Sequence, residues 1–189
     1  MSYFLQQGFF VLRVRYLNKI SGGLRRLRYT LQGMKVGKGT TLPRLKVTWP
    51  HQVSVGDNCL LEHDIYFKYD GIWKPGPIIN IADRVFIGTG CEFNITKGIT
   101  IGNDSLIASG CRFIDHNHGT EPGELMRLQN GAEEAITIGQ NVWLGCNVVV
   151  LKGITVGHGA VVAAGSVLTK TIPPNEVWGG VPAKKLKDR

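Results

Sequence analysis

Residues 138–173 read IGQNVW-LGCNVV-VLKGIT-VGHGAV-VAAGSV-LTKTIP, and this stretch decides the fold. Every block of six begins with an aliphatic side chain: Ile138, Leu144, Val150, Val156, Val162 and Leu168. The next position is small, as Gly or Ala, in four of the six blocks. Shorter runs upstream share the pattern: Ile81, Ile87, Phe93 and Ile99; Ile101, Ile107 and Phe113; Val55, Leu61 and Phe67; and more weakly Val36 and Leu42. A period of six fits neither an α-helix, with about 3.6, nor a strand, with about two.

Six residues supply one short strand and one corner, so three hexads, about 18 residues, close a triangular coil. The aliphatic residue then points inward and stacks on its equivalent one coil away, while Gly, Asn and Asp suit the corners. The sequence therefore predicts an all-β protein, a parallel β-helix. A β-sandwich is the main alternative, but its strands alternate with a period of two and are punctuated every 8–12 residues or so.

The chain divides into three segments. Residues 1–35 form a basic amphipathic N-terminal segment, expected to be short and helical, and residues 36–173 form the β-helix. Residues 119–135 carry no hexad and are expected to form a loop that shapes an acceptor pocket. Residues 174–189 form a C-terminal tail.

The net charge of +8 is concentrated at one end of the chain. Residues 1–56 hold ten Lys or Arg and no Asp or Glu, and apolar residues are interleaved with these charges. A basic amphipathic helix is able to lie on an anionic membrane surface, here through residues 1–30. The alternative interpretation is a solvated helix that packs on the main body or on a neighbouring subunit. No nucleic-acid partner is expected, because no binding motif accompanies the charge.

The four cysteines are spread out and form no CxxC pair, which is typical of free thiols in a reducing cytoplasm. The first residues lack the basic and apolar regions of a signal peptide. We therefore expect a cytoplasmic protein, with peripheral attachment to the inner face of a bacterial membrane as the alternative that the basic segment leaves open.

Three further stretches resemble a known family. They are Asn141-Val142-Trp143-Leu144-Gly145, the run from Val162 to Lys170, and Gly179-Gly180-Val181-Pro182-Ala183-Lys184. With the hexads, they make residues 36–189 similar to the hexapeptide-repeat acyltransferases, in the branch of maltose, galactoside, capsule and O-antigen O-acetyltransferases. The resemblance implies a left-handed β-helix, a homotrimer with its sites between subunits, acetyl-coenzyme A as acyl donor, no metal, and a sugar or glycan acceptor.

The residues themselves point to a histidine. A sugar hydroxyl needs a general base to attack a thioester, and an imidazole suits this role. Of five histidines only His116 and His118 stand in a polar cluster, Asp115-His116-Asn117-His118. Alignment with the galactoside branch implies that His118 is the base and that His116 orients the acceptor.

Supporting residues follow from the same reasoning. Asp115, or a glutamate of the following loop (Glu121, Glu124, Glu133 or Glu134), is expected to hold the base in its useful tautomer. Asn117 is expected to support the acceptor site. The resemblance implies that Trp143 lies in the groove near the thioester or the acceptor, although Trp143 is equally explained as a packing residue at the subunit seam.

The resemblance also implies cofactor-binding residues. These are Cys146, Ala164, Thr169, Lys170 and Lys187, with the two lysines facing phosphates. One departure concerns the acceptor: Gly88 stands where the galactoside branch has an Asn, and Asn94 is a candidate replacement one hexad later.

Three alternatives remain open at this point. The first is N-acetylation of an amino sugar by the same base mechanism. The second is a metal enzyme resembling the γ-type carbonic anhydrases, with His116 and His118 as ligands. The third is a non-catalytic β-helix that serves as a scaffold or binding module.

Overall fold

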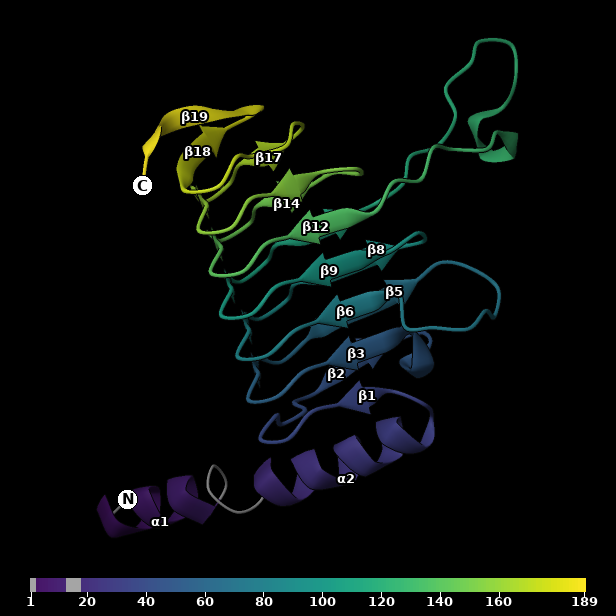
Figure 1. Ribbon diagram of the computed structural model, residues 1–189. Helices are drawn as coiled ribbons and strands as arrows, with labels where there is room; N and C mark the ends of the chain where they lie inside the picture. Colours follow the sequence, from purple (N-terminus) through teal and green to yellow (C-terminus); the bar gives the residue numbers. More distant parts are fainter. Residues whose placement is uncertain (1–2, 13–17) are drawn as a thin grey trace.

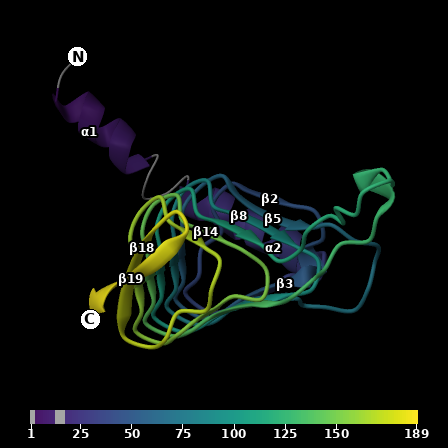
Figure 2. The ribbon, with the colours of Figure 1, turned by 90° about the horizontal axis from the view of Figure 1, so that it is seen from above.

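The computed structural model describes residues 3–12 and 18–189, so residues 1–2 and 13–17 of the predicted N-terminal segment lie outside the described residues. Short strands wind upward in successive coils, and three sheets form the sides of a prism (Figures 1 and 2). The first sheet contains β1 (Lys35–Val36), β3 (Val53–Val55), β6 (Ile79–Ile81), β9 (Ile99–Ile101), β12 (Ile136–Ile138) and β15 (Thr155–Val156). The second contains β4 (Leu60–Leu61), β7 (Phe86–Ile87), β10 (Leu106–Ile107), β13 (Trp143–Leu144), β16 (Val161–Val162), β18 (Glu176–Gly180) and β19 (Ala183–Asp188). The third contains β2 (Leu45–Val47), β5 (Ile65–Tyr69), β8 (Glu92–Ile95), β11 (Arg112–Ile114), β14 (Val149–Val150) and β17 (Val167–Leu168).

The strand pairing confirms the period of six. Neighbouring strands from β1 to β18 are parallel, and residues three hexads apart lie side by side, as in the pairs Ile138 with Val156, Leu144 with Val162, and Val150 with Leu168. All six hexad-initial residues of 138–173 are buried. Each coil therefore contributes one inward side chain per face, as the repeat predicts.

Aromatic residues fill the core in the lower part of the third sheet. Phe67, Phe93 and Phe113 are fully buried in β5, β8 and β11. Their ring centroids are 4.9 Å apart for the first pair and 4.7 Å for the second. Such offset contacts add to the burial of apolar area, so this column stabilises three consecutive coils.

The corners explain the small residues of the repeat. A Cβ on Gly145 would lie 2.6 Å from the backbone nitrogen of Ala164 in the next coil, so only glycine permits the coils to stack this closely. Asn147, two residues later, has a φ of 58°. This left-handed conformation is tolerated by Asn, as expected for the corner residues.

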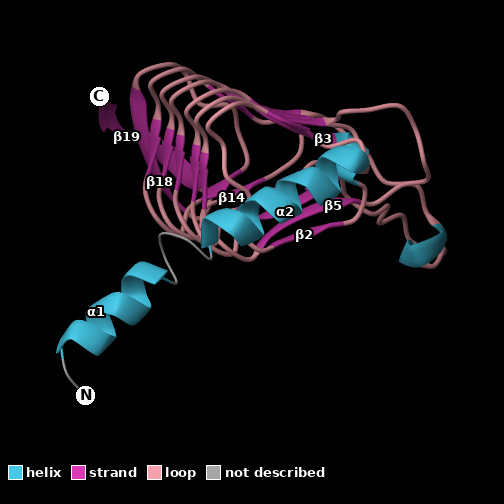
Figure 3. Cartoon of the chain, turned by 90° about the horizontal axis from the view of Figure 1, so that it is seen from below, coloured by secondary structure: helices cyan, strands magenta, loops and turns pink. Residues whose placement is uncertain are grey.

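A helix covers the open edge of the first coil (Figure 3). α2 (Asn18–Leu31) is held by arginines: Arg25 Nε donates to the carbonyl of Leu42 at 2.9 Å, and Arg26 donates to those of Thr40 and Val36 at 3.2 and 3.0 Å. α1 (Tyr3–Val11) lies beyond α2, away from the coils, and none of its residues is buried.

At the other end, β18 continues the second sheet above β16, and β19 folds back antiparallel on β18. No helix in the described part of the chain has the length and apolar character needed to cross a membrane.

Two loops leave the prism at the corner between the third and first sheets, which we call the loop corner (Figure 2). The shorter joins β5 to β6, where a 3-10 helix, η2 (Pro50–Gln52), packs below it. The longer joins β11 to β12, carries a second 3-10 helix, η3 (Met126–Leu128), and projects farthest from the coils (Figure 1).

Candidate functional site

The polar cluster predicted from the sequence lies at the base of the longer loop. Residues 115–118 follow β11 directly, and the returning strand of the loop pairs with them: Asn117 N donates to Ala132 O at 3.0 Å, and Glu134 N donates to Asp115 O at 2.9 Å. A side chain at Gly131 would overlap the carbonyl of Asn117. The close pairing of these two segments fixes the backbone that carries the two histidines.

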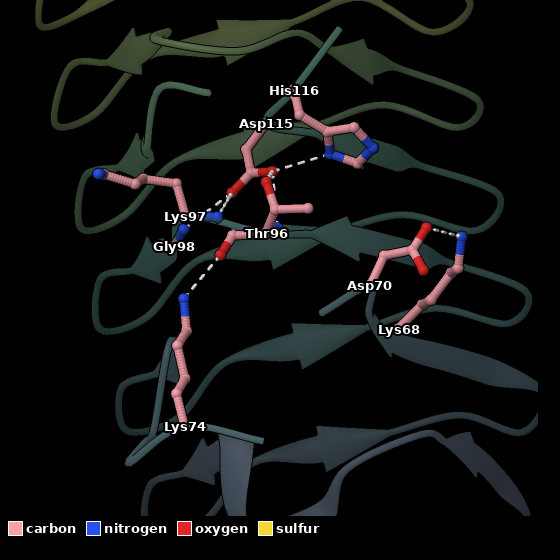
Figure 4. A network of polar contacts seen from close by, with 8 residues as sticks. All are labelled: Lys68, Asp70, Lys74, Thr96, Lys97, Gly98, Asp115 and His116. Atoms are coloured by element: carbon pink, nitrogen blue, oxygen red, sulfur yellow. Dashed lines mark hydrogen bonds and ion pairs between the residues drawn. The ribbon is translucent and has the colours of Figure 1, made fainter. Parts of the chain in front are cut away.

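Asp115 is fully buried and accepts five hydrogen bonds (Figure 4). Its Oδ2 accepts the backbone N–H groups of Lys97 and Gly98, both at 2.8 Å. Its Oδ1 accepts from the backbone nitrogen and the hydroxyl of Thr96, at 2.9 and 3.1 Å, and lies 3.1 Å from Nδ1 of His116. The carboxylate thus anchors the turn one coil below and fixes the ring of His116, whose Nε2 is left to face outward.

His118 and its neighbour Asn117 are exposed. Among the described residues, neither Asp115 nor any glutamate of the loop forms a hydrogen bond or an ion pair with the ring of His118. Glu134 instead forms an ion pair with Lys152 one coil above. The histidine that a carboxylate orients is therefore His116, whereas His118 is exposed beside it.

Asp70 of the shorter loop adds a residue that the sequence did not single out. The ammonium of Lys68, 2.8 Å away, lowers the pKa of this carboxyl, and the neighbouring imidazole of His116 contributes to the same shift. Asp70 and His116 follow strands two coils apart in the third sheet (Figure 4). The sequence could have revealed this arrangement, because Asp70 and His116 each stand three residues after the first residue of a hexad, Phe67 and Phe113, and such positions share a corner.

The interior of the longer loop is tied by one side chain. Gln129 accepts from Glu121 N at 2.8 Å and donates to the carbonyls of Glu121 and Glu124 at 2.9 and 2.8 Å. Leu125, Met126 and Leu128 are exposed beside it. The loop therefore presents an apolar tip above a polar base.

The five predicted cofactor residues do not share one cavity within a single chain. Cys146 and Ala164 lie one above the other at the corner between the second and third sheets, where Gly165 N donates to Cys146 O at 2.8 Å. Thr169 and Lys170 lie at the loop corner and line a pocket of about 270 Å³. Lys187 lies on β19 opposite Val177, outside that pocket.

The 270 Å³ pocket is nonetheless cationic. Lys184 and Lys185 of β19 line it together with Lys170, and Trp178 and Pro182 complete it. A second pocket, of about 540 Å³, lies between α2 and the first coils. It is lined by Arg25, Arg44 and His63 among others and is remote from the histidine cluster in sequence and in coil number.

Trp143 stands in an outward column of apolar residues that the sequence reasoning missed. Its side chain is 53% exposed on the second sheet. Strand register aligns it with residues of the same character below and above: Leu60, Phe86, Leu106, Val161 and Val177. The corresponding column on the first sheet is polar from the second coil up: Ser54, Asn80, Thr100, Thr137 and Thr155. The sequence does carry a signal for this column: in the hexads of the second sheet, the residue directly before the buried aliphatic residue is also apolar.

The described residues were also compared with the ligand sets of metal sites. No group of three or more His, Cys, Asp or Glu side chains there is arranged to hold an ion. The metal-enzyme alternative therefore gains no support from this geometry.

Two family models match the coils. Residues 135–170 match the bacterial transferase hexapeptide (six repeats), and residues 78–111 match the hexapeptide repeat of succinyl-transferase. WbbJ of Escherichia coli (strain K12), provisionally named a lipopolysaccharide biosynthesis O-acetyl transferase, is 40% identical over 118 residues, 58% of this chain and 60% of its own length. The galactoside O-acetyltransferase of the same strain is 35% identical over 139 residues, 71% of this chain and 63% of its own length.

The coils of this chain are built from the bacterial transferase hexapeptide repeat. The resemblance drawn from the hexads and from Gly179–Lys184 is confirmed, and so is the left-handed parallel β-helix that it implied. The chain spans less than two thirds of the length of the two curated relatives.

Solved structures of hexapeptide-repeat proteins share this fold. The acetyltransferase VCA0836 of Vibrio cholerae, solved with acetyl coenzyme A, has a TM-score of 0.61 and 28% identity, covering 87% of this chain and 77% of its own. AntD of Bacillus cereus, an N-acyltransferase solved with dTDP and 3-hydroxybutyryl-CoA, has a TM-score of 0.74 at 17% identity, covering 87% and 88%. The second similarity is one of fold alone.

Proposed function

We propose that this protein transfers the acetyl group of acetyl-coenzyme A to a hydroxyl of a sugar, in a building block of capsule, exopolysaccharide or lipopolysaccharide. The observation that carries the proposal is the pair of histidines at the base of the longer loop: His116 is fixed by buried Asp115, and His118 is exposed beside it. WbbJ and the galactoside enzyme, two of the curated relatives, both carry O-acetyltransferase names, which supports the reaction type.

In this proposal His118 is the general base. Its imidazole takes the proton of the acceptor hydroxyl while the oxygen attacks the carbonyl carbon of the thioester. The tetrahedral intermediate carries a negative charge, which backbone N–H groups of the coil are suited to stabilise. Collapse breaks the C–S bond, and the departing thiolate takes the proton back from the imidazolium. His116 orients the acceptor through the outward Nε2 that its contact with Asp115 leaves available.

The acyl donor would lie in a groove completed by a second copy of the chain. Cys146 and Ala164 are proposed to contact the pantetheine arm, and Thr169, Lys170 and Lys187 the phosphates. The first two lie at a different corner from Thr169 and Lys170, so a single chain does not gather them. A homotrimer would bring the loop corner of one copy to the second sheet of its neighbour, and the exposed apolar column through Leu106 and Trp143 supports this seam.

The test is acetyl-CoA turnover, measured as thiol released, across sugars and sugar nucleotides. His118→Ala should lower the rate by at least about 10²-fold with acetyl-CoA binding near normal, since a general base contributes roughly 10²–10⁴. His158→Ala is the matched control, because His158 is an exposed histidine after β15, at another corner. A larger loss in His116→Ala would reverse the two roles, and full activity in both variants would refute histidine catalysis.

The acceptor panel should include amino sugars. The same base mechanism serves an amine, so release dependent on an amino sugar alone would change the reaction to N-acetylation. The proposed setting is the cytoplasm, with attachment at the inner face of the membrane, where polysaccharide precursors carried on lipids would be within reach.

A further inference from the structure

α2 is an amphipathic helix whose apolar side faces away from the protein. Ile20, Leu24, Leu27 and Leu31 recur at helical spacing and are 62%, 64%, 58% and 80% exposed. An amphipathic helix of a globular protein normally turns such a stripe toward the core. Here the orientation is reversed, so the stripe is available to something outside the chain.

Polar contacts fix this reversed orientation. Arg25, Arg26 and Tyr29 lie on the opposite side of the helix and donate to backbone carbonyls of the first coils. A Cβ on Gly22 would lie 3.6 Å from the carbonyl oxygen of Leu42, so the helix approaches the coil closely there. These carbonyls belong to the open edge of the β-helix and would otherwise lack partners. Rotating the leucines inward would break the hydrogen bonds, so the stripe stays outside.

The charges carried by the two helices and the segment that follows them, residues 1–56, are of one sign. Residues 1–56 contain ten basic residues and no acidic one. Arg28 is exposed and flanks the stripe on the helix. On the side of α2 that faces the coils, Arg44 lines the 540 Å³ pocket together with Glu62, whereas the exposed side of the helix carries Arg28. α1 adds further exposed apolar side chains, among them Phe4, Phe9 and Phe10.

We infer that the stripe of α2, together with α1, docks on the surface of a lipid bilayer that contains anionic lipids. The apolar side chains enter the boundary between headgroups and acyl chains, and the basic residues face the lipid phosphates. Charge decides between the occupants, because a second copy of this surface would bring two acid-free segments together and repel. The docking is independent of the proposed chemistry, since α2 lies at the opposite end of the coils from Lys170.

The experiment compares vesicle binding of three full-length proteins by flotation. The vesicles consist of phosphatidylcholine alone or mixed with phosphatidylglycerol. The variant Leu24→Gln/Leu27→Gln removes apolar area but keeps a residue of good helix propensity. Ile72→Gln is the matched control, because Ile72 is 87% exposed on the shorter loop.

Wild type and Ile72→Gln should bind the anionic vesicles alike and release them at high salt. The double variant should bind at least about 10-fold more weakly, because two leucines leave the bilayer. Equal binding by the double variant, or no preference of wild type for anionic vesicles, would refute the inference. A drop in molecular mass in the double variant without vesicle binding by wild type would instead identify the stripe as a contact between copies. Thiol release from acetyl-CoA with a soluble acceptor should be equal in all three proteins, so loss of docking is separable from failure of the proposed reaction.

Discussion

At the scale of single residues, Asp115 does more for structure than its place in a histidine cluster indicated. Its carboxylate accepts three backbone N–H groups, from Thr96, Lys97 and Gly98, besides holding His116. Sequence reasoning assigned it only to the tautomer of the base. The donors lie 17 to 19 residues earlier, one coil below, and only the register of β8 and β11 brings them to the carboxylate.

Replacing Asp115 by Ala should therefore lower the free energy of unfolding by about 1–3 kcal/mol, because backbone donors lose their acceptor. Urea denaturation measures this, with Asp70→Ala as the control, since the Asp70 carboxylate is 56% exposed and pairs with the side chain of Lys68 rather than with backbone donors. An equal loss in both variants would contradict the anchoring role. A smaller loss in Asp115→Asn is expected, because the amide keeps one acceptor oxygen.

Cys146 is the exposed cysteine among four, whereas Cys59, Cys91 and Cys111 are buried. Burial raises the pKa of the Cys59 thiol, which leaves less of the reactive thiolate. Iodoacetamide should therefore label one cysteine per folded chain, and peptide mass spectrometry should locate the label at Cys146.

Acetyl-CoA at ten times its dissociation constant should slow this labelling about tenfold if Cys146 lies in the proposed groove. Alkylation in denaturant, where all four cysteines should react, is the control. Unchanged labelling in the presence of bound acetyl-CoA would remove Cys146 from the cofactor site.

At the scale of elements, the hexad repeat predicted the buried positions and the pairing of the strands in the coils. Hexads define which residues are buried and which lie three hexads apart, because every coil imposes the same contacts. The long loop after β11 and the hairpin of β18 and β19 lack hexads, so their conformations depend on particular contacts such as those of Gln129 and are invisible to a periodic pattern.

The aromatic column offers a test of the stacked core. Phe93 lies between Phe67 and Phe113, so Phe93→Ala should lower the free energy of unfolding by about 3–5 kcal/mol. Thr100→Ala, on the outer surface of β9, the next strand along the chain, should change the free energy of unfolding by no more than about 0.5 kcal/mol. Thermal and urea denaturation measure both, and a loss below about 1 kcal/mol for Phe93→Ala would mean that the column relaxes to fill the gap.

At the scale of the whole molecule, two of the three sides of the prism differ in character. The apolar column of the second sheet is proposed to join copies, whereas the polar column of the first sheet faces water. Leu106→Glu should therefore dissociate the proposed trimer, seen by light scattering as a threefold fall in mass, and should abolish thiol release from acetyl-CoA. Thr100→Glu places the same charge on the first sheet and should leave the mass unchanged; a monomeric wild type would refute the shared groove.

The position of α2 at one end of the coils has a consequence for such a trimer. Three parallel coils related by a threefold axis turn the same end in the same direction, so three α2 stripes would lie in one plane. Once the first stripe touches a flat lipid sheet, the others are held at a high effective concentration, and weak contacts multiply into avidity. A sharply curved or narrow surface that engages only one stripe would lose this gain, so the assembly would discriminate surfaces by their shape as well as by their charge.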